Sequence, residues 1–228
     1  MAQGLHEAGV ELALIDIQDT IHQVAQEIGA DGPPVYAVQG DLSDREQLRR
    51  AFDESVSKLG GLDILLNNAG ITRWSPAESM SHEDWDIVLE VNLNSVFFMA
   101  QLAGRHMLAQ GHGKIVNIAS MLSYGGGYLT VGYAASKGGV AQMTKALANE
   151  WASKGINVNA IAPGYMATEM NIPLMEDKER EKLILDRVPA NRWGLPQDLV
   201  GVLIFLSSDA SDYLHGILVP VDGGFLAR

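Results

Sequence analysis

The 228-residue sequence contains no cysteine. Its six histidines are scattered without the spacing of a metal site, so we assign no metal ligand. The missing cysteine excludes a disulfide scaffold, thiolate metal sites, iron–sulfur clusters and cysteine nucleophiles.

Basic residues are scarce, with 16 Lys+Arg against 28 Asp+Glu and a net charge of −12. Nucleic acids and anionic membranes recruit Lys/Arg-rich surfaces, so neither is expected as a partner. No uncharged apolar run approaches the ~20 residues that a membrane span needs. The N-terminus has no basic region and Glu11 interrupts its apolar part, so it is unlike a secretion signal. These features predict an acidic, cytoplasmic protein.

Short apolar runs rich in Val, Ile and Leu alternate with longer segments of helical period. Near-continuous apolar runs are typical of strands covered on both faces, as in a parallel sheet. The sequence therefore predicts one α/β domain over residues 1–228, with a doubly wound, mostly parallel sheet flanked by helices. The expected strands are Val10–Ile17, Val35–Val38, Leu62–Leu66, Lys114–Ile118, Ile156–Ile161 and Ile217–Val221. The expected helices are Thr20–Ile28, Asp44–Leu59, His82–Leu108, Gly132–Ser153 and Gln197–Leu206.

Candidate chemical groups follow two of the predicted strands, at the edge where parallel sheets bind ligands. Asn67–Gly70 follows the third strand, and its small residues let a ligand approach the backbone closely. A simple turn with an Asx cap remains an equally open interpretation of this tetrapeptide. Ser120 follows the fourth strand, and the next helix begins near Tyr133.

Tyr133 and Lys137 lie one helical turn apart on the same face of that helix. An ammonium close to a phenol stabilises the phenolate, so we expect the pKa of Tyr133 to fall from its ordinary value near ~10. Such a tyrosine can exchange a proton with an alcohol or carbonyl oxygen, and Ser120 can hydrogen-bond the same oxygen. Taken alone, a Tyr–Lys pair at this spacing is more often a solvated helix face.

The motifs together resemble the short-chain dehydrogenase/reductase family over essentially the whole chain. The resemblance implies that Tyr133 is the general acid/base and that Lys137 binds the nicotinamide ribose and lowers the tyrosine pKa. It also implies that Ser120 orients the substrate oxygen and that Asn92 holds a water in a proton relay. The matching segments are Asn67–Gly70, Val91–Leu93, Ser120, Tyr133 with Lys137, Pro163–Gly164 with Thr168, and Val221–Gly224.

The resemblance also implies a Rossmann-like fold and a set of cofactor contacts. Asp16 ends the first visible strand, where an acid accepts hydrogen bonds from both ribose hydroxyls and repels a 2′-phosphate. We therefore expect NAD rather than NADP, although Asp16 also fits a helix cap or turn. The implied cofactor-binding residues are Asp16, Asp41, Leu42, Asn68, Ala69, Gly70, Tyr133, Lys137, Pro163, Gly164, Met166 and Thr168. For Met166, packing in the pocket is the competing interpretation.

One part of the family pattern is missing. The family begins with a strand, a Gly-rich turn and a helix whose N-terminus receives the pyrophosphate. Here Met1–Ala8 resembles the end of that helix, and nothing precedes it. The sheet is therefore expected to lack its usual first strand and to contain a gap with unpaired backbone groups. The sequence is either an incomplete version of a longer chain or a shortened protein that binds the cofactor poorly.

Several segments resemble the sugar-acid branch of the family, which oxidises deoxygluconate and gluconate compounds. A sugar-acid pocket needs a cation and several hydroxyl partners. Arg73 is one candidate for the carboxylate and Arg192 is another. Ser120, Ser123 and Tyr165 are expected to contact the small-molecule substrate.

Three other expectations complete the interpretation. The family's association helices predict a homo-oligomer, a tetramer or a dimer. One alternative function is a 3-oxoacyl carrier-protein reductase, which the scarcity of basic residues disfavours because the carrier is acidic. The other is a non-catalytic shortened homologue that acts as a subunit or binding module.

Overall fold

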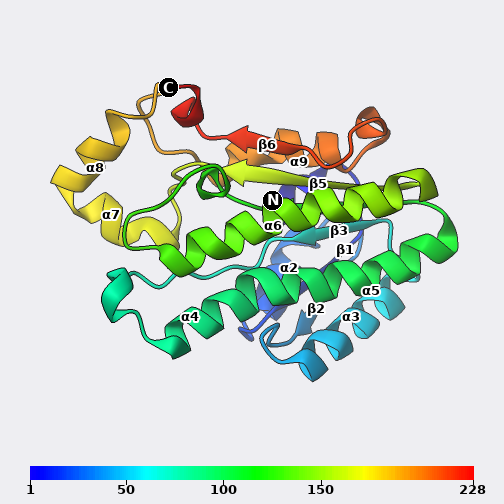
Figure 1. Cartoon of the computed structure of the whole chain (residues 1–228). Coiled ribbons are helices and arrows are strands. Elements are labelled where there is room, and N and C mark those ends of the chain that lie inside the picture. Colours follow the sequence, from blue (N-terminus) through cyan, green and yellow to red (C-terminus); the bar gives the residue numbers. More distant parts are fainter.

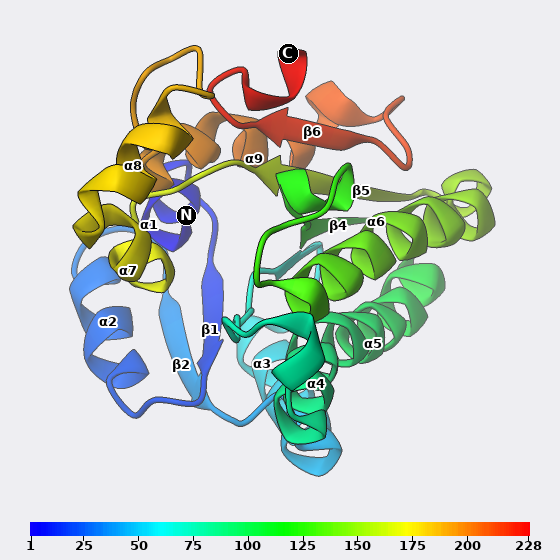
Figure 2. The same cartoon turned by 60° about the vertical axis from the view of Figure 1, so that its left-hand side comes forward.

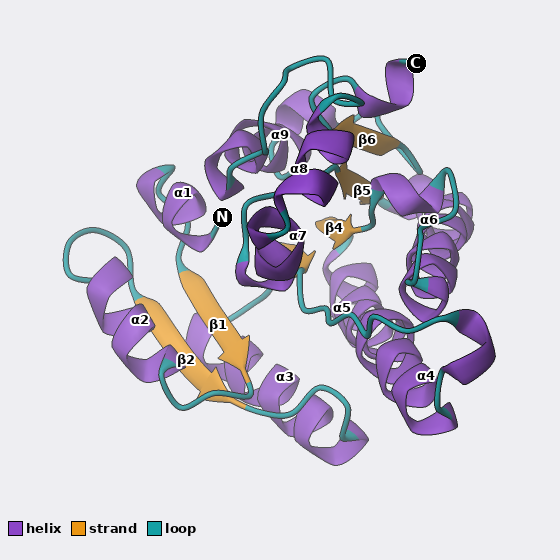
Figure 3. Cartoon of the chain, turned by 90° about the vertical axis from the view of Figure 1, so that its left-hand side faces the viewer, coloured by secondary structure: helices purple, strands orange, loops and turns teal.

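The computed structural model describes residues 1–228, in which six parallel strands form two separate sheets. One sheet has the order β3-β4-β5-β6, and the other pairs β1 with β2 (Figure 3). All six predicted strands are confirmed, with ends that differ by at most two residues. The strands are β1 Leu12–Asp16, β2 Val35–Gln39, β3 Ile64–Asn67, β4 Gly113–Ile118, β5 Ile156–Pro163 and β6 Leu218–Val221.

The helices connect these strands and cover both faces of the sheets. Helices α3, α5 and α6 contact one face, whereas α2 and α9 contact the other (Figures 1 and 2). The predicted doubly wound arrangement is therefore confirmed. The helices are α1 Ala2–Glu7, α2 Ile21–Ile28, α3 Arg45–Leu59, α4 His82–Leu89, α5 Ser95–Gln110, α6 Val131–Trp151, α7 Ile172–Glu176, α8 Lys178–Leu185 and α9 Val200–Leu206.

The core lies between the four-stranded sheet and the helices that cover it. Ile115 of β4 and Val158 of β5 pack in one apolar cluster with Met99 and Ala103 of α5. On β5, every residue from Ile156 to Ala162 is buried, as expected for a strand covered on both faces. This buried strand holds the neighbouring strand ends in a fixed position.

The predicted helix His82–Leu108 is interrupted by one turn of π-helix at Glu90–Asn94. The whole segment His82–Gln110 is long and apolar enough to cross a membrane by length and composition alone. However, 44% of its apolar window is buried inside the fold, where Met99 and Ala103 belong to the core. The apolar character of this helix is therefore explained by packing on the sheet.

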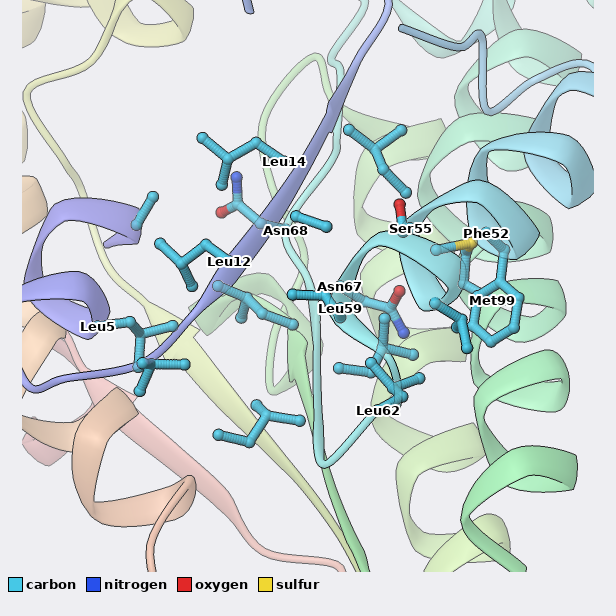
Figure 4. A pocket seen from close by; sticks show the side chains of 18 of the residues that line it. Leu5, Leu12, Leu14, Phe52, Ser55, Leu59, Leu62, Asn67, Asn68 and Met99 are labelled. Carbon is cyan, nitrogen blue, oxygen red and sulfur yellow. The ribbon is translucent and has the colours of Figure 1, made fainter. Parts of the chain in front are cut away.

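The predicted gap in the sheet is confirmed, because β1 pairs only with β2 and β3 pairs only with β4. A cavity of about 930 Å³ lies between the facing edges of β1 and β3. Mostly apolar side chains line it, among them Leu12, Leu14, Leu62 and Met99 (Figure 4). The backbone groups on these two facing edges have no ladder partner, an arrangement that is unfavourable for buried strands.

Candidate active site

Ser120 and Tyr133 meet beyond the carboxyl end of β4. Ser120 is buried, and its hydroxyl accepts a hydrogen bond from the Leu122 amide at 3.1 Å, which starts a short 3₁₀ turn. Tyr133 lies in the first turn of α6, where a side-chain hydrogen bond with Ser120 acts to lower its pKa. The fold therefore brings these two predicted catalytic groups together.

Lys137 is almost completely buried one turn further along α6, at 2% exposure. Its Nζ donates to the Ile118 carbonyl at 2.7 Å and lies 5.7 Å from the centre of the Tyr133 ring. Burial lowers the pKa of Lys137 to about 8, because the cation is removed from water.

The expectation that the pKa of Tyr133 falls is wrong for this structure. Burial is the largest effect and raises the pKa of the phenol above its ordinary value, and the Ser120 hydrogen bond only opposes it. The Lys137 ammonium donates its hydrogen bond to the Ile118 carbonyl of β4 rather than to the phenol. The spacing of the two residues correctly predicted their proximity but not the direction of this electrostatic effect.

Asn92 lies in the π-helical turn and is completely buried. Its Oδ1 accepts from the Ile71 amide and its Nδ2 donates to the Ile71 carbonyl, both at 2.8 Å. The same Nδ2 also lies 3.2 Å from the Ser136 hydroxyl. Single π-helical turns are frequent at functional sites, and here the turn aims Asn92 at the segment that follows β3.

Gly70 lies directly beside Asn92 and Lys137. A Cβ at this position would be 3.4 Å from Asn92 Oδ1 and 3.5 Å from Lys137 Nζ. Such a Cβ would make ordinary van der Waals contacts, so the backbone at Gly70 runs directly beside both polar groups. The Gly70 backbone, the Lys137 ammonium and the Tyr133 ring are therefore neighbours in the fold.

Four of the predicted cofactor residues line the cavity of about 930 Å³ described above, namely Asp16, Leu42, Asn68 and Ala69. Asn68 is labelled in Figure 4. Asp16 is exposed at the end of β1, and its Oδ1 accepts from the Gln18 amide at 2.9 Å. The turn interpretation and the ribose-binding interpretation are thus compatible. Asp41, another predicted cofactor residue, does not line the cavity. Its carboxylate accepts hydrogen bonds from the Ser43 amide and from the Ser43 hydroxyl.

The loop after β5 contains the remaining predicted cofactor residues. A Cβ at Gly164 would lie 2.6 Å from the Asp222 Cα, so glycine is required for this close approach. The Met166 side chain is buried in the apolar core and touches Gly194, which supports the packing interpretation. Pro163 ends β5, and Thr168 is exposed before a short 3₁₀ turn.

The predicted substrate contacts have different surroundings. Arg73 Nε lies 3.2 Å from Asp84 Oδ1, so this guanidinium already has a carboxylate partner. The Ser123 hydroxyl donates to the Lys137 carbonyl at 2.7 Å, which ties the 3₁₀ turn to α6. Tyr165 is half-buried in edge contact with the rings of Trp193 and Phe225.

A buried polar network that connects β3, β4 and α6 was not expected from the sequence. Asn67 Nδ2 donates to Asn117 Oδ1 at 2.9 Å, and Asn117 Nδ2 donates to Thr144 Oγ1 at 3.0 Å. These bonds connect β3, β4 and α6, and Asn67 lies opposite Asn117 in the strand register. The sequence does show one asparagine near the end of each of these two strands. Whether the two side chains can reach each other depends on the strand register, which the sequence does not give.

A parallel α/β fold with Ser120 after β4 and with Tyr133 and Lys137 near the start of α6 is typical of one class of protein, the dinucleotide-dependent oxidoreductases. Comparison with known proteins identifies the group within this class. The family model described as Enoyl-(Acyl carrier protein) reductase matches residues 1–226. The chain belongs to the short-chain dehydrogenase/reductase family, whose members are NAD(P)-dependent oxidoreductases.

Individual relatives agree with this assignment. The chain is 48% identical to 2-dehydro-3-deoxy-D-gluconate 5-dehydrogenase of Escherichia coli, over 100% of this chain and 90% of that protein. It is 38% identical to gluconate 5-dehydrogenase of Gluconobacter oxydans, over 98% of this chain and 88% of that protein. A crystal structure of gluconate 5-dehydrogenase from Burkholderia cenocepacia, in complex with NADP and tartrate, superimposes with a TM-score of 0.96 at 39% identity. That match covers 100% of this chain and 89% of the Burkholderia chain.

Proposed function

We propose that this protein interconverts a secondary alcohol and a ketone on a sugar acid of the gluconate type. The observation that carries the proposal is the meeting of Ser120, Tyr133 and Lys137 beyond the carboxyl end of β4, with the backbone of Gly70 beside Lys137. The similarity to 2-dehydro-3-deoxy-D-gluconate and gluconate dehydrogenases supports the choice of substrate class.

In the proposed reaction, the phenolate form of Tyr133 takes the proton of the substrate hydroxyl during oxidation and becomes the phenol, and the phenol returns that proton during reduction. Ser120 donates a hydrogen bond to the same oxygen as charge develops on it. Lys137 keeps a positive charge close to the tyrosine, and Asn92 fixes the backbone at Ile71 beside it. The nicotinamide cofactor supplies the hydride acceptor or donor when it is bound.

We propose that Lys137 and Tyr133 hold the nicotinamide ribose, and that Asp16 holds the adenosine ribose. The exposed carboxylate at the end of β1 favours NAD, since it would repel the 2′-phosphate of NADP. In this proposal, Asp41 and Leu42 contact the adenine, and Asn68, Ala69 and Gly70 form the adenosine-side wall. The loop Pro163–Thr168 holds the nicotinamide carboxamide and the pyrophosphate, whereas the Gly-rich turn that binds the pyrophosphate in the family is not within residues 1–228.

We further propose that residues 1–228 act as a single domain and that the protein is cytoplasmic and forms a homo-oligomer. The charge balance supports a location in the cytoplasm. Phe97 and Leu108 of α5 and Val131 of α6 are more than a third exposed, so these helices present apolar groups outward. An association face on α5 and α6, in a dimer or a tetramer, would cover them.

The central test replaces Tyr133 with phenylalanine. We expect turnover of D-gluconate or 2-dehydro-3-deoxy-D-gluconate to fall by about 10²–10⁴-fold, because the proton-transferring hydroxyl is removed. Binding of the cofactor, measured by titration with NADH, should remain nearly unchanged. Tyr213→Phe is the matched control, since Tyr213 is fully exposed. Near-normal turnover by Tyr133→Phe, or activity on a 3-oxoacyl thioester with NADPH and on no sugar acid, would contradict the proposal.

A further inference from the structure

Arg180 of α8 is held between two aromatic rings and has no acidic partner. Its Cζ lies 5.7 Å from the centre of the Trp74 ring and 5.6 Å from the centre of the Tyr128 ring. None of the ion pairs in the chain includes it, although Glu179 and Glu181 are its sequence neighbours. Contacts with aromatic faces stabilise a guanidinium but leave its N–H donors available.

The three side chains come from segments that leave the carboxyl ends of three adjacent strands. Trp74 follows β3, Tyr128 lies between β4 and α6, and Arg180 follows β5. The Ser75 amide donates to the Leu129 carbonyl at 3.0 Å and joins the first two segments. Helices α7 and α8 lie on the side toward which the arrowheads of β5 and β6 point (Figure 1). Arg180 is therefore on the same side of the sheet as the proposed catalytic group.

The other arginines considered for the substrate already have partners. Arg73 pairs with Asp84, and Arg192 makes two hydrogen bonds to the carboxylate of Asp198 at 2.6 and 3.0 Å. The Arg192–Asp198 pair occupies both sides of the guanidinium fork, and it also lowers the pKa of Asp198 to about 2. A substrate carboxylate would have to displace Asp84 from Arg73 or Asp198 from Arg192. At Arg180 there is no protein carboxylate to displace.

We propose that Arg180 binds the carboxylate of the sugar-acid substrate, with Trp74 and Tyr128 holding the guanidinium in place. Planar guanidinium groups bind carboxylates through two parallel hydrogen bonds, which fix orientation as well as position. Binding the carboxylate at α8 would set which hydroxyl of the sugar acid reaches Tyr133. This inference rests on the proposed sugar-acid function and assigns the residue that selects for an acid.

The test compares D-gluconate with the neutral D-gluconamide in wild type and in Arg180→Gln. A hydrogen-bonded charge pair is worth about 1.5–3 kcal/mol, so KM for D-gluconate should rise about 10–100-fold with kcat changed much less. The KM for D-gluconamide should be unchanged, so the variant loses the preference for the acid. Calorimetric titration with D-gluconate should show the same loss of affinity without turnover.

Lys182→Gln is the matched control, because it removes one positive charge from an exposed position of the same helix. It should leave both KM values unchanged. Arg180→Lys keeps the charge but loses the planar fork, so it should recover only part of the affinity. An unchanged KM for D-gluconate in Arg180→Gln overturns the assignment of Arg180 alone. A wild-type protein that neither binds nor turns over any sugar acid overturns the proposed function and this inference together.

Discussion

Replacing Lys137 with methionine should increase the free energy of unfolding relative to the wild type, and this gain should be larger at neutral pH than at high pH. Methionine has a similar length and no charge, so it fills the same space without burying an ammonium. In the wild type, burial lowers the pKa of Lys137 from 10.5 to about 8. The folded state therefore binds the proton of this residue more weakly than the unfolded state.

The direction of the pH effect follows from this difference. Above pH 10.5 the lysine is neutral in both states, and it has no effect on the free energy of unfolding. As the pH falls from 10.5 to 8, the unfolded chain binds a proton that the folded chain does not, so the wild type loses stability. Below pH 8 the full penalty is present, and it amounts to about 3 kcal/mol. Both the amine and the ammonium can donate the hydrogen bond to Ile118, so its loss in the variant lowers stability by a similar amount at each of these pH values.

Urea unfolding of wild type and Lys137→Met at pH 7 and pH 10 measures this effect. The stability of the variant minus that of the wild type should be larger at pH 7 than at pH 10 by about 2–3 kcal/mol. Lys182→Met is the control for removing an exposed lysine, and its difference should not vary in this way. A difference for Lys137→Met that is independent of pH would refute the reasoning. The same variant should lose turnover, as expected where a functional group is retained at the expense of stability.

Two further predictions concern the cofactor and the backbone. Asp16→Asn removes the carboxylate that would repel a 2′-phosphate. The KM for NADP should therefore fall at least about 10-fold, and the KM for NAD should rise. Unchanged steady-state constants for both cofactors would contradict the role of Asp16. Gly155→Ala should destabilise the fold by more than Gly60→Ala. Both glycines have positive φ, for which a side chain costs about 1–2 kcal/mol, but only at Gly155 would the new Cβ also meet the Gly111 carbonyl oxygen, at 2.1 Å. Urea unfolding compares the two variants, and equal losses would show that the close contact relaxes freely.

Local sequence determined the six strands and the longer helices of this fold, whereas α7 and α8 are not among the helices expected from it. Each strand is a short run of Val, Ile and Leu, and each long helix has its own apolar period, so both can be predicted without knowing their neighbours. The order Ser120, Tyr133, Lys137 also predicted the proposed site, because a residue after a strand and the start of the next helix meet at one sheet edge. Even the gap between β1 and β3 was predicted, because it follows from which strand of the family's sheet order is missing from the sequence.

Only the tertiary structure decided how these side chains are paired and how far they are buried. The pKa of Tyr133 rises because α6 packs that residue and Lys137 away from water, which no spacing along the chain reveals. Arg73 was expected at the substrate, yet Asp84 lies within reach of it, whereas Arg180 is left with aromatic neighbours from two other segments. Periodicity in a sequence reports which face of an element is buried, but charge pairing and desolvation depend on residues that come together only after folding.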